Sequence, residues 1–241
     1  AIKKTGLTMS SDIIMGLPGE TFDSTLQTVK EIVQAEVDEV HLWTLMMLDG
    51  SELNIPQERE KWGIKTKYRI IPRDFVKLSS GKVVAEIEEV GIITNTLSFE
   101  EYLDLRSLAL VVQVTKTGSV FAPIMKFLKE QNLDVYDLVY NMTYRNSHAS
   151  ENIKKLFDVF RKSTIDELWD SPEEIERNYQ DDAEYQKLLD GVAGQNLILY
   201  YHTIIISQFI SDWTEYVLDT AKNLIMNNKK VSDVELEKQF T

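Results

Sequence analysis

The segment from Asp12 to Thr21 (DIIMGLPGET) has the residue types and spacing best suited to binding a ligand. It follows a short apolar run and precedes a helical pattern, so the loop lies at the carboxyl end of a predicted strand, where α/β proteins bind their ligands. Gly16 and Gly19 allow a close backbone approach to a ligand, and Pro18 stiffens the turn between them. The absence of a lysine after the second glycine excludes a phosphate-binding P-loop. An ordinary loop between strand and helix is the alternative interpretation.

The other residue types that could do chemistry are dispersed along the chain. His41, His148 and His202 fall in a predicted strand, a loop and an apolar helix, so each is interpreted as a structural or exposed histidine. The chain has no cysteine, which excludes disulfides, thiolate zinc sites and any iron–sulfur cluster held by this chain alone. We therefore predict no catalytic residue and no metal ligand.

The composition predicts a protein with a substantial core and without affinity for nucleic acid. Of 241 residues, 43% are hydrophobic, and 26 basic against 39 acidic side chains give a formal charge of -13. Such a charge repels phosphate backbones. The chain has no signal-peptide pattern, and its longest apolar run, Leu197–Ile210, is too short and interrupted to cross a bilayer. We expect a cytoplasmic protein with neither a nucleic-acid nor a membrane partner.

Two strand patterns and a helix pattern must position the glycine loop. Residues 7–15 and 37–48 have strand patterns, and Thr21 can cap a helix between them. Strands buried on both faces and joined by a helix indicate a parallel βαβ unit. A polar helix or loop follows around residues 57–62. A short strand at 68–71 and an extended segment at 82–94, interrupted at Gly91, complete this part of the chain.

The pattern becomes helical from Ser98, which forms a predicted capping box with Glu101. The fold class is therefore α/β plus α, with an α/β part at residues 1–98 and a helical domain at 99–241. Leu197–Ile210 is expected to be a central core helix; the alternative is packing against another domain or a second copy. The predicted helices lie near residues 99–114, 118–131, 134–146, 150–161, 172–190, 195–227 and 231–239.

Several motifs resemble the later barrel strands of radical S-adenosylmethionine (SAM) enzymes, in the subgroup often associated with a cobalamin-binding domain. The similarity extends over residues 1–105 and is most specific in the first fifty; Asp49-Gly50-Ser51 departs from the family's usual Pro-Gly-Thr. The motifs are Lys4-Thr5-Gly6-Leu7, Asp12-x-Ile14-x-Gly16-Leu17-Pro18-Gly19-Glu20-Thr21, Leu48-Asp49-Gly50-Ser51, Arg69-Ile70-Ile71-Pro72 and Thr94-Asn95-Thr96-Leu97-Ser98 followed by Glu100-Glu101-Tyr102.

The resemblance implies that residues 1–98 are a partial (β/α) barrel segment with an extended connection. It also implies a 4Fe–4S cluster on a Cys-x-x-x-Cys-x-x-Cys loop, which binds SAM and cleaves it reductively for radical chemistry on an unknown substrate. Hydrogen abstraction, methyl transfer and rearrangement all remain open as the reaction. Positions that match the family's adenine contacts are Ile14, Gly16, Leu17, Pro18, Gly19, Glu20, Leu45, Met46 and Met47.

Because the cluster loop is missing, we expect a carboxy-terminal fragment that is inactive alone and binds SAM weakly or not at all. Its implied partners are the N-terminal barrel half, a cobalamin domain with its cobalamin, and a reductase. A strand edge left open by truncation would be covered by the chain's own helices, by a homodimer or by aggregation.

Two alternatives remain open. One is a free-standing α+β protein-interaction module built on a barrel-derived scaffold, and the other is a small enzyme that binds a different nucleotide at the glycine loop. The coding sequence ahead of Ala1 discriminates between the first of these and the fragment. A three-cysteine motif about 100–150 residues upstream, the spacing of four missing βα units, would favour the fragment.

Overall fold

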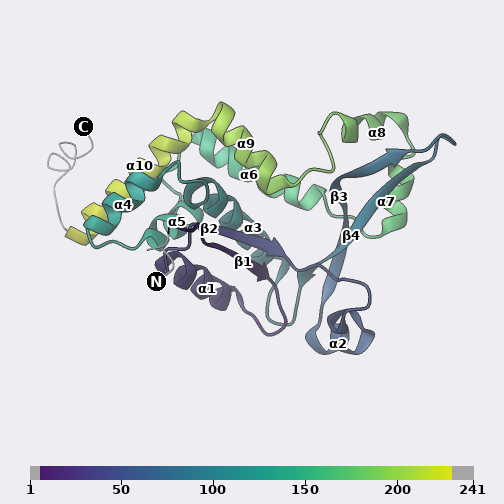
Figure 1. Ribbon diagram of the computed structural model, residues 1–241, viewed down its shortest axis with the longest axis horizontal. Helices are drawn as coiled ribbons and strands as arrows, with labels where there is room; N and C mark the ends of the chain where they lie inside the picture. Colours follow the sequence, from purple (N-terminus) through teal and green to yellow (C-terminus); the bar gives the residue numbers. More distant parts are fainter. Residues whose placement is uncertain (1–5, 230–241) are drawn as a thin grey trace.

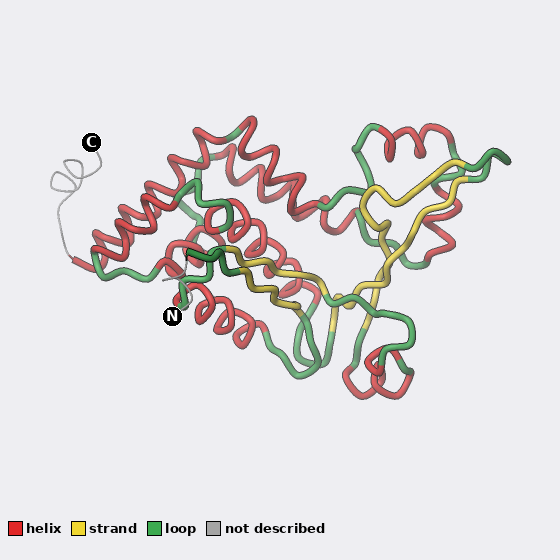
Figure 2. The backbone as a smooth tube through the Cα atoms, in the orientation of Figure 1, coloured by secondary structure: helices red, strands yellow, loops and turns green. Residues whose placement is uncertain are grey.

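The computed structural model describes residues 6–229 and has a mixed α/β fold in which helices predominate (Figures 1 and 2). Strands β1 (Ser10–Met15) and β2 (Glu39–Thr44) pair in parallel and are joined by helix α1 (Phe22–Gln34), as the sequence predicts. Both strands are shorter than predicted. The hydroxyl of Thr21 accepts a hydrogen bond from the Ser24 amide and caps α1.

The connection from residue 51 to residue 97 forms a long hairpin beside this βαβ unit (Figure 1). A 3-10 turn, η2 (Glu52–Asn54), and helix α2 (Pro56–Trp62) lead into antiparallel strands β3 (Lys65–Lys77) and β4 (Val83–Ile93). β4 continues through Gly91, but its pairing with β3 shifts register there, so the predicted interruption is an irregularity within the strand. A second shift lies between Ile70 and Phe75.

Helix α3 (Phe99–Val111) is the central helix of the fold. Ser98 and Glu101 form the predicted capping box, and eight of the thirteen residues of α3 are buried. Because the buried positions lie around the whole helix, α3 has neighbours on every side. A π-helical turn, η3 (Val112–Lys116), extends its carboxyl end.

Of the remaining helices, α7 and α8 lie beside the hairpin and the others pack around α3 (Figure 1). They are α4 (Ala122–Glu130), α5 (Val135–Tyr144), α6 (Glu151–Asp166), α7 (Pro172–Asn178), α8 (Asp182–Leu189), α9 (Leu197–Gln208) and α10 (Ile210–Lys229).

Two helix predictions need correction, and a third lies outside the described residues. The predicted helix 172–190 is two helices, because Asp181 caps α8 with its own carboxylate. The predicted helix 195–227 is also two, α9 and α10, separated at Phe209. The segment 231–239 lies outside the described residues.

The expectation that Leu197–Ile210 forms a central core helix is wrong. α9 lies beside α6 at the outer side of the molecule, and only Tyr201 and Ile205 are buried in it. Leu199 remains 52% exposed. α9 therefore has more apolar residues than its one packed face can bury. The central position belongs to α3.

The hydrophobic residues form two clusters. The larger extends from β1, α1 and β2 through α3 to α10, so it crosses the predicted division at residue 98 without a break. The smaller is built on Ile70, Val83, Ile175, Tyr179 and Leu188, where α7 and α8 flank the β3–β4 hairpin. None of the helices in the described part of the chain combines the length and apolar character needed to span a membrane.

Candidate functional site

The glycine loop after β1 is a tight turn held by neighbouring elements. Gly16 and Gly19 have φ of +84° and +81°, and the Glu20 amide donates to the Leu17 carbonyl at 3.0 Å. A residue with a side chain is strained at positive φ, so both of these positions favour glycine. The hydroxyl of Thr96 donates to the Glu20 carbonyl at 2.6 Å, so the segment after β4 fixes the end of the loop.

The carboxylate of Glu20 lacks hydrogen bonds that would stabilise its charge. Its Oε2 atom is buried and has no hydrogen-bond partner. Burial raises the pKa of this carboxyl above its ordinary value, because the charged form loses solvation. Of the predicted contact residues, Glu20 is therefore the one with an unused polar atom.

The second predicted segment, Leu45–Met47, follows β2 and pairs with β4. The Gly91 amide donates to the Leu45 carbonyl at 2.8 Å, and the Met47 amide donates to the Glu89 carbonyl at 2.9 Å. The side chains of Leu45 and Met47 are buried, whereas Met46 is 42% exposed. The side chain of Met46 is therefore the one in this segment that is open to a ligand.

The parallel pairing brings both predicted segments to the same edge. Ile14 is opposite Trp43 in the register, and Asp12 is opposite His41. Ile14 and Trp43 are 43% and 48% exposed, and the Trp43 indole donates to an Asp12 carboxylate oxygen at 2.8 Å. We call Asp12, Ile14, His41 and Trp43 the open strand face. It leads at its carboxyl end to Met46 and to the glycine loop.

A cavity of about 290 Å³, the β2 cavity, adjoins this face. Met46 is the one predicted contact residue that lines it. The residues around it are His41, Leu42, Trp43, Thr44, Met46, Arg69, Pro72, Glu88, Arg106, Ala109, Gln113 and Gln195–Leu199. Sequence analysis did not identify this cavity, because its lining comes from β2, β3, β4, α3, η3 and the start of α9.

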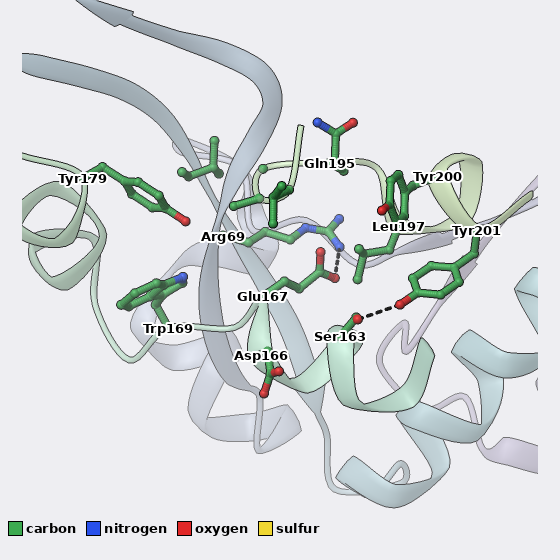
Figure 3. A pocket seen from close by; sticks show the side chains of 14 residues that line it. Arg69, Ser163, Asp166, Glu167, Trp169, Tyr179, Gln195, Leu197, Tyr200 and Tyr201 are labelled. Carbon is green, nitrogen blue, oxygen red and sulfur yellow. Dashed lines mark hydrogen bonds and ion pairs between the residues drawn. The ribbon is translucent and has the colours of Figure 1, made fainter. Parts of the chain in front are cut away.

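A second cavity of about 290 Å³, the α6 cavity, shares Arg69, Gln195 and Leu197 with the first. Figure 3 shows Arg69 reaching across it, with Glu167 beside the guanidinium. The Ser163 and Tyr201 hydroxyls are 2.8 Å apart at its wall. The α6 cavity is bounded by two carboxylates, Asp166 and Glu167, against the single guanidinium of Arg69.

The two cavities adjoin a buried group of charges. Arg69 donates to a Glu88 oxygen through Nε and to Glu167 Oε1 through Nη1 at 3.1 Å. Burial lowers the pKa of Arg69, but the charges of Glu167 and Glu88 and the hydrogen bond to Glu88 outweigh it, so the pKa is raised overall. Arg69 therefore stays protonated and holds β3 to β4 and to the segment after α6.

Arg106 is less well paired. It is 5% exposed, and its Nη2 atom lies 3.6 Å from Glu167 Oε1, beyond ordinary hydrogen-bond length. Its Nε atom is buried without a partner. The one sequence signal for this position is a single arginine within the apolar pattern of residues 99–111, which sequence analysis did not single out.

The three histidines have separate surroundings. His41 Nδ1 lies 3.3 Å from the Gln113 side-chain oxygen, and His148 Nε2 lies 2.9 Å from the Thr220 hydroxyl. Burial lowers the pKa of His202, which favours its neutral form. In the described part of the chain, no three His, Cys, Asp or Glu side chains converge as a metal-ion site would require.

Comparison with known proteins gives no assignment, since neither a protein-family model nor a curated protein matches the chain.

Proposed function

We propose that this chain is the carboxy-terminal part of a radical SAM enzyme and contributes one wall of its SAM site. The observation that supports this most directly is the open strand face. One side of the parallel β1–β2 pair packs into the core, while Ile14 and Trp43 on the other side are exposed. In a closed (β/α) barrel such a side faces the interior.

The residues of the proposed wall suit the adenosyl part of SAM. Adenine binding needs apolar surface and nearby backbone polar groups, which Ile14, Met46 and the Gly16–Gly19 turn could provide. These residues would bind and orient the nucleoside, and we assign no proton transfer to them.

The chain's own side chains do not fit an iron–sulfur cluster, since none of them is a thiolate. Cysteines on additional residues would have to hold it, and cobalamin would likewise require a further domain. With the cluster in place, reductive cleavage of SAM would supply a 5′-deoxyadenosyl radical. A reductase would deliver the electron.

The proposal is tested by reading the coding sequence ahead of Ala1 and expressing the polypeptide it encodes. The protein is purified without oxygen, supplied with iron and sulfide, and mixed with SAM and dithionite. We expect 5′-deoxyadenosine, measured by liquid chromatography and mass spectrometry. An upstream sequence without three clustered cysteines, or a reconstituted protein that forms no 5′-deoxyadenosine, would refute the proposal.

A matched pair of variants tests the wall itself. Ile14→Glu adds a charge on the open strand face, and Val159→Glu adds one on α6 at an almost equal exposure, 43% against 44%. We expect Ile14→Glu to weaken SAM binding about tenfold or more, because a carboxylate would be desolvated against adenine. Val159→Glu should leave binding unchanged. Equal effects of the two changes would remove Ile14 from the wall.

The alternative, a protein-interaction module, has one observation in its favour. Leu189, Val192 and Leu199 are 55%, 71% and 52% exposed around the start of α9. Such side chains are typical of surfaces that contact other proteins. An upstream sequence that begins near Ala1 would favour this alternative. The homodimer expected from the sequence remains a further proposal for the cover of the open strand face.

A further inference from the structure

We propose that the β2 cavity binds a small organic anion, with the carboxylate or phosphate group of the ligand at Arg106. The cavity lies outside the predicted SAM contacts except for Met46. Three features support the inference: the incomplete pairing of Arg106, the hydrogen-bond donors of the cavity lining and the apolar walls around it.

The incomplete pairing of the buried Arg106 guanidinium destabilises the folded protein. A buried guanidinium normally donates to several acceptors, but Arg106 has one distant carboxylate, on Glu167, and an unpartnered Nε. Glu167 also accepts from Arg69 at 3.1 Å, so its charge is shared between two arginines. A buried polar group without a partner destabilises a protein. An anion at the part of the Arg106 guanidinium that borders the cavity would supply a closer acceptor than Glu167.

The cavity lining contains several hydrogen-bond donors suited to an anion. Two guanidiniums, on Arg69 and Arg106, border the cavity together with the Glu88 carboxylate. Glu167 lies beside both guanidiniums and balances the second positive charge. Gln113 and Asn196 add side-chain amides, and the start of α9 adds the positive end of a twelve-residue helix. These donors would attract an anion although the charges of the group balance.

The other walls are apolar and define the rest of the ligand. Leu42, Pro72, Ala109 and the residues Leu197–Leu199 line the cavity, and Trp43 contributes an aromatic ring. With a volume of about 290 Å³, the space suits a small molecule. The geometry therefore fits a compact apolar or aromatic body that carries one anionic group.

The position of the cavity links it to the proposed function. Trp43 and Met46 belong both to the cavity lining and to the region of the proposed SAM wall. If the proposed function holds, the anion would be the substrate, held beside the adenosyl group. That role rests on the proposed function, whereas anion binding by the cavity does not.

Isothermal titration calorimetry on the 241-residue chain tests the inference with three probes. Benzoate and phenyl phosphate carry the two anionic groups on an aromatic ring, and benzamide is the uncharged counterpart of benzoate. We expect saturable binding of at least one anion and none of benzamide. The stronger anion identifies the head group. Failure of both anions to bind, or equal binding of benzamide, would overturn the inference.

The variant Arg106→Met removes the charge and keeps the length of the side chain. We expect it to weaken binding of the preferred anion about tenfold or more, since charge-assisted hydrogen bonds are lost. Arg161→Met is the matched control, because Arg161 pairs with Glu100 and Asp104 at the surface of α6. Anion binding that survives Arg106→Met, or that Arg161→Met weakens equally, would contradict the inference.

A third variant serves if Arg106→Met does not fold. Leu199 is 52% exposed and lines the cavity, so Leu199→Trp would narrow the cavity without touching Arg106. We expect weaker binding of both anions, and unchanged binding would overturn the proposed location. All these measurements omit SAM and iron. A negative result for anion binding therefore does not refute the proposed function. A negative 5′-deoxyadenosine test likewise does not refute anion binding.

Discussion

Glu20 and Arg106 both have a buried polar atom without a partner, and both lie at a proposed binding site. A fold selected only for stability would pair or replace such groups. The two atoms are closed to solvent, so each destabilises the fold. At the scale of single residues, we therefore predict that stability improves when one of these groups is neutralised.

Glu20→Gln tests this for the glycine loop. Burial raises the pKa of Glu20 in the folded protein, so the charged form destabilises the fold once the pH exceeds the ordinary pKa of the unfolded chain. The neutral variant should be more stable at pH 7 by roughly 1 kcal/mol or less, because the carboxylate is only partly buried. Thermal unfolding across pH measures the difference.

The pH dependence provides the internal control for Glu20→Gln. Below the ordinary pKa of a glutamate, the carboxyl is protonated in both the folded and the unfolded state, and the two proteins should unfold at the same temperature. Their difference should appear as the pH rises through that value and become constant above the raised folded pKa. A variant less stable than the parent at pH 7 would show that the carboxylate has a favourable partner.

Single residues were predictable from the sequence where the reason is local. Gly16, Gly19 and the caps at Thr21 and Ser98 follow from turn and helix geometry within a few residues. The charges around Arg106 were not predictable. They come together from separate elements, and residues 88, 106 and 167 have no common spacing that a sequence pattern could reveal.

At the scale of elements, the start of α3 is a suitable place to measure how the central helix is stabilised. The amide and the hydroxyl of Ser98 each donate to the Glu101 carboxylate at 2.7 Å, and the Ser98 hydroxyl accepts from the Glu101 amide. The hydrogen bonds from Ser98 lower the pKa of Glu101. Ser98→Ala should destabilise the protein by about 1 kcal/mol, as measured by urea unfolding.

The contribution of Ser98 should depend on pH. A carboxyl with a lowered folded pKa stabilises the fold above its ordinary value and loses that contribution as the pH falls through the folded pKa. The cost of Ser98→Ala should therefore decrease on acidification. Ser107→Ala is the control within the same helix, since the Ser107 hydroxyl donates only to the Leu103 carbonyl. A constant cost at all pH values would contradict the role of the Glu101 charge.

The positions of α3 and α9 show the limit of helical patterns. α9 has the more apolar sequence, which favoured a core position, yet two of its twelve residues are buried. α3 contains an arginine and several acidic residues and is nevertheless central. Apolar periodicity indicates that a helix needs cover; the order in which helices surround a core depends on contacts between distant segments.

At the scale of the whole molecule, the small hydrophobic cluster of the hairpin should unfold more easily than the large one. It has five buried members, and its edge is held by Tyr68 and Trp169, which exchange backbone hydrogen bonds at 2.9 and 2.8 Å. Ile175→Ala, at a fully buried position, should destabilise this cluster by about 2–4 kcal/mol.

Amide hydrogen exchange measures where this destabilisation acts. We expect faster exchange in β3, β4, α7 and α8 and unchanged exchange in α3. Ile165→Ala is the matched control, because Ile165 is 43% exposed and its loss should change stability little. Faster exchange throughout the chain would mean that both clusters unfold as one unit.

The mixed α/β class with many helices was predictable because the βαβ unit and the capping boxes leave local signals. The hairpin strands left signals at residues 68–71 and 82–94, but the full length of β3, its pairing with β4 and their separate hydrophobic cluster were not predictable. Their apolar positions are interrupted by charges such as Arg69 and Glu88, which pair with each other in the fold but read as exposed residues in the sequence.

The π-helical turn η3 at the end of α3 restricts which sequence changes this segment can accept during evolution. Its wider winding accommodates an extra residue and sets the direction of Gln113, which reaches His41. Loss of one residue here would restore ordinary α-helical winding and change which side chain of this turn faces His41. Substitutions keep the wider turn, so they should preserve the direction of residue 113, whereas a deletion should not.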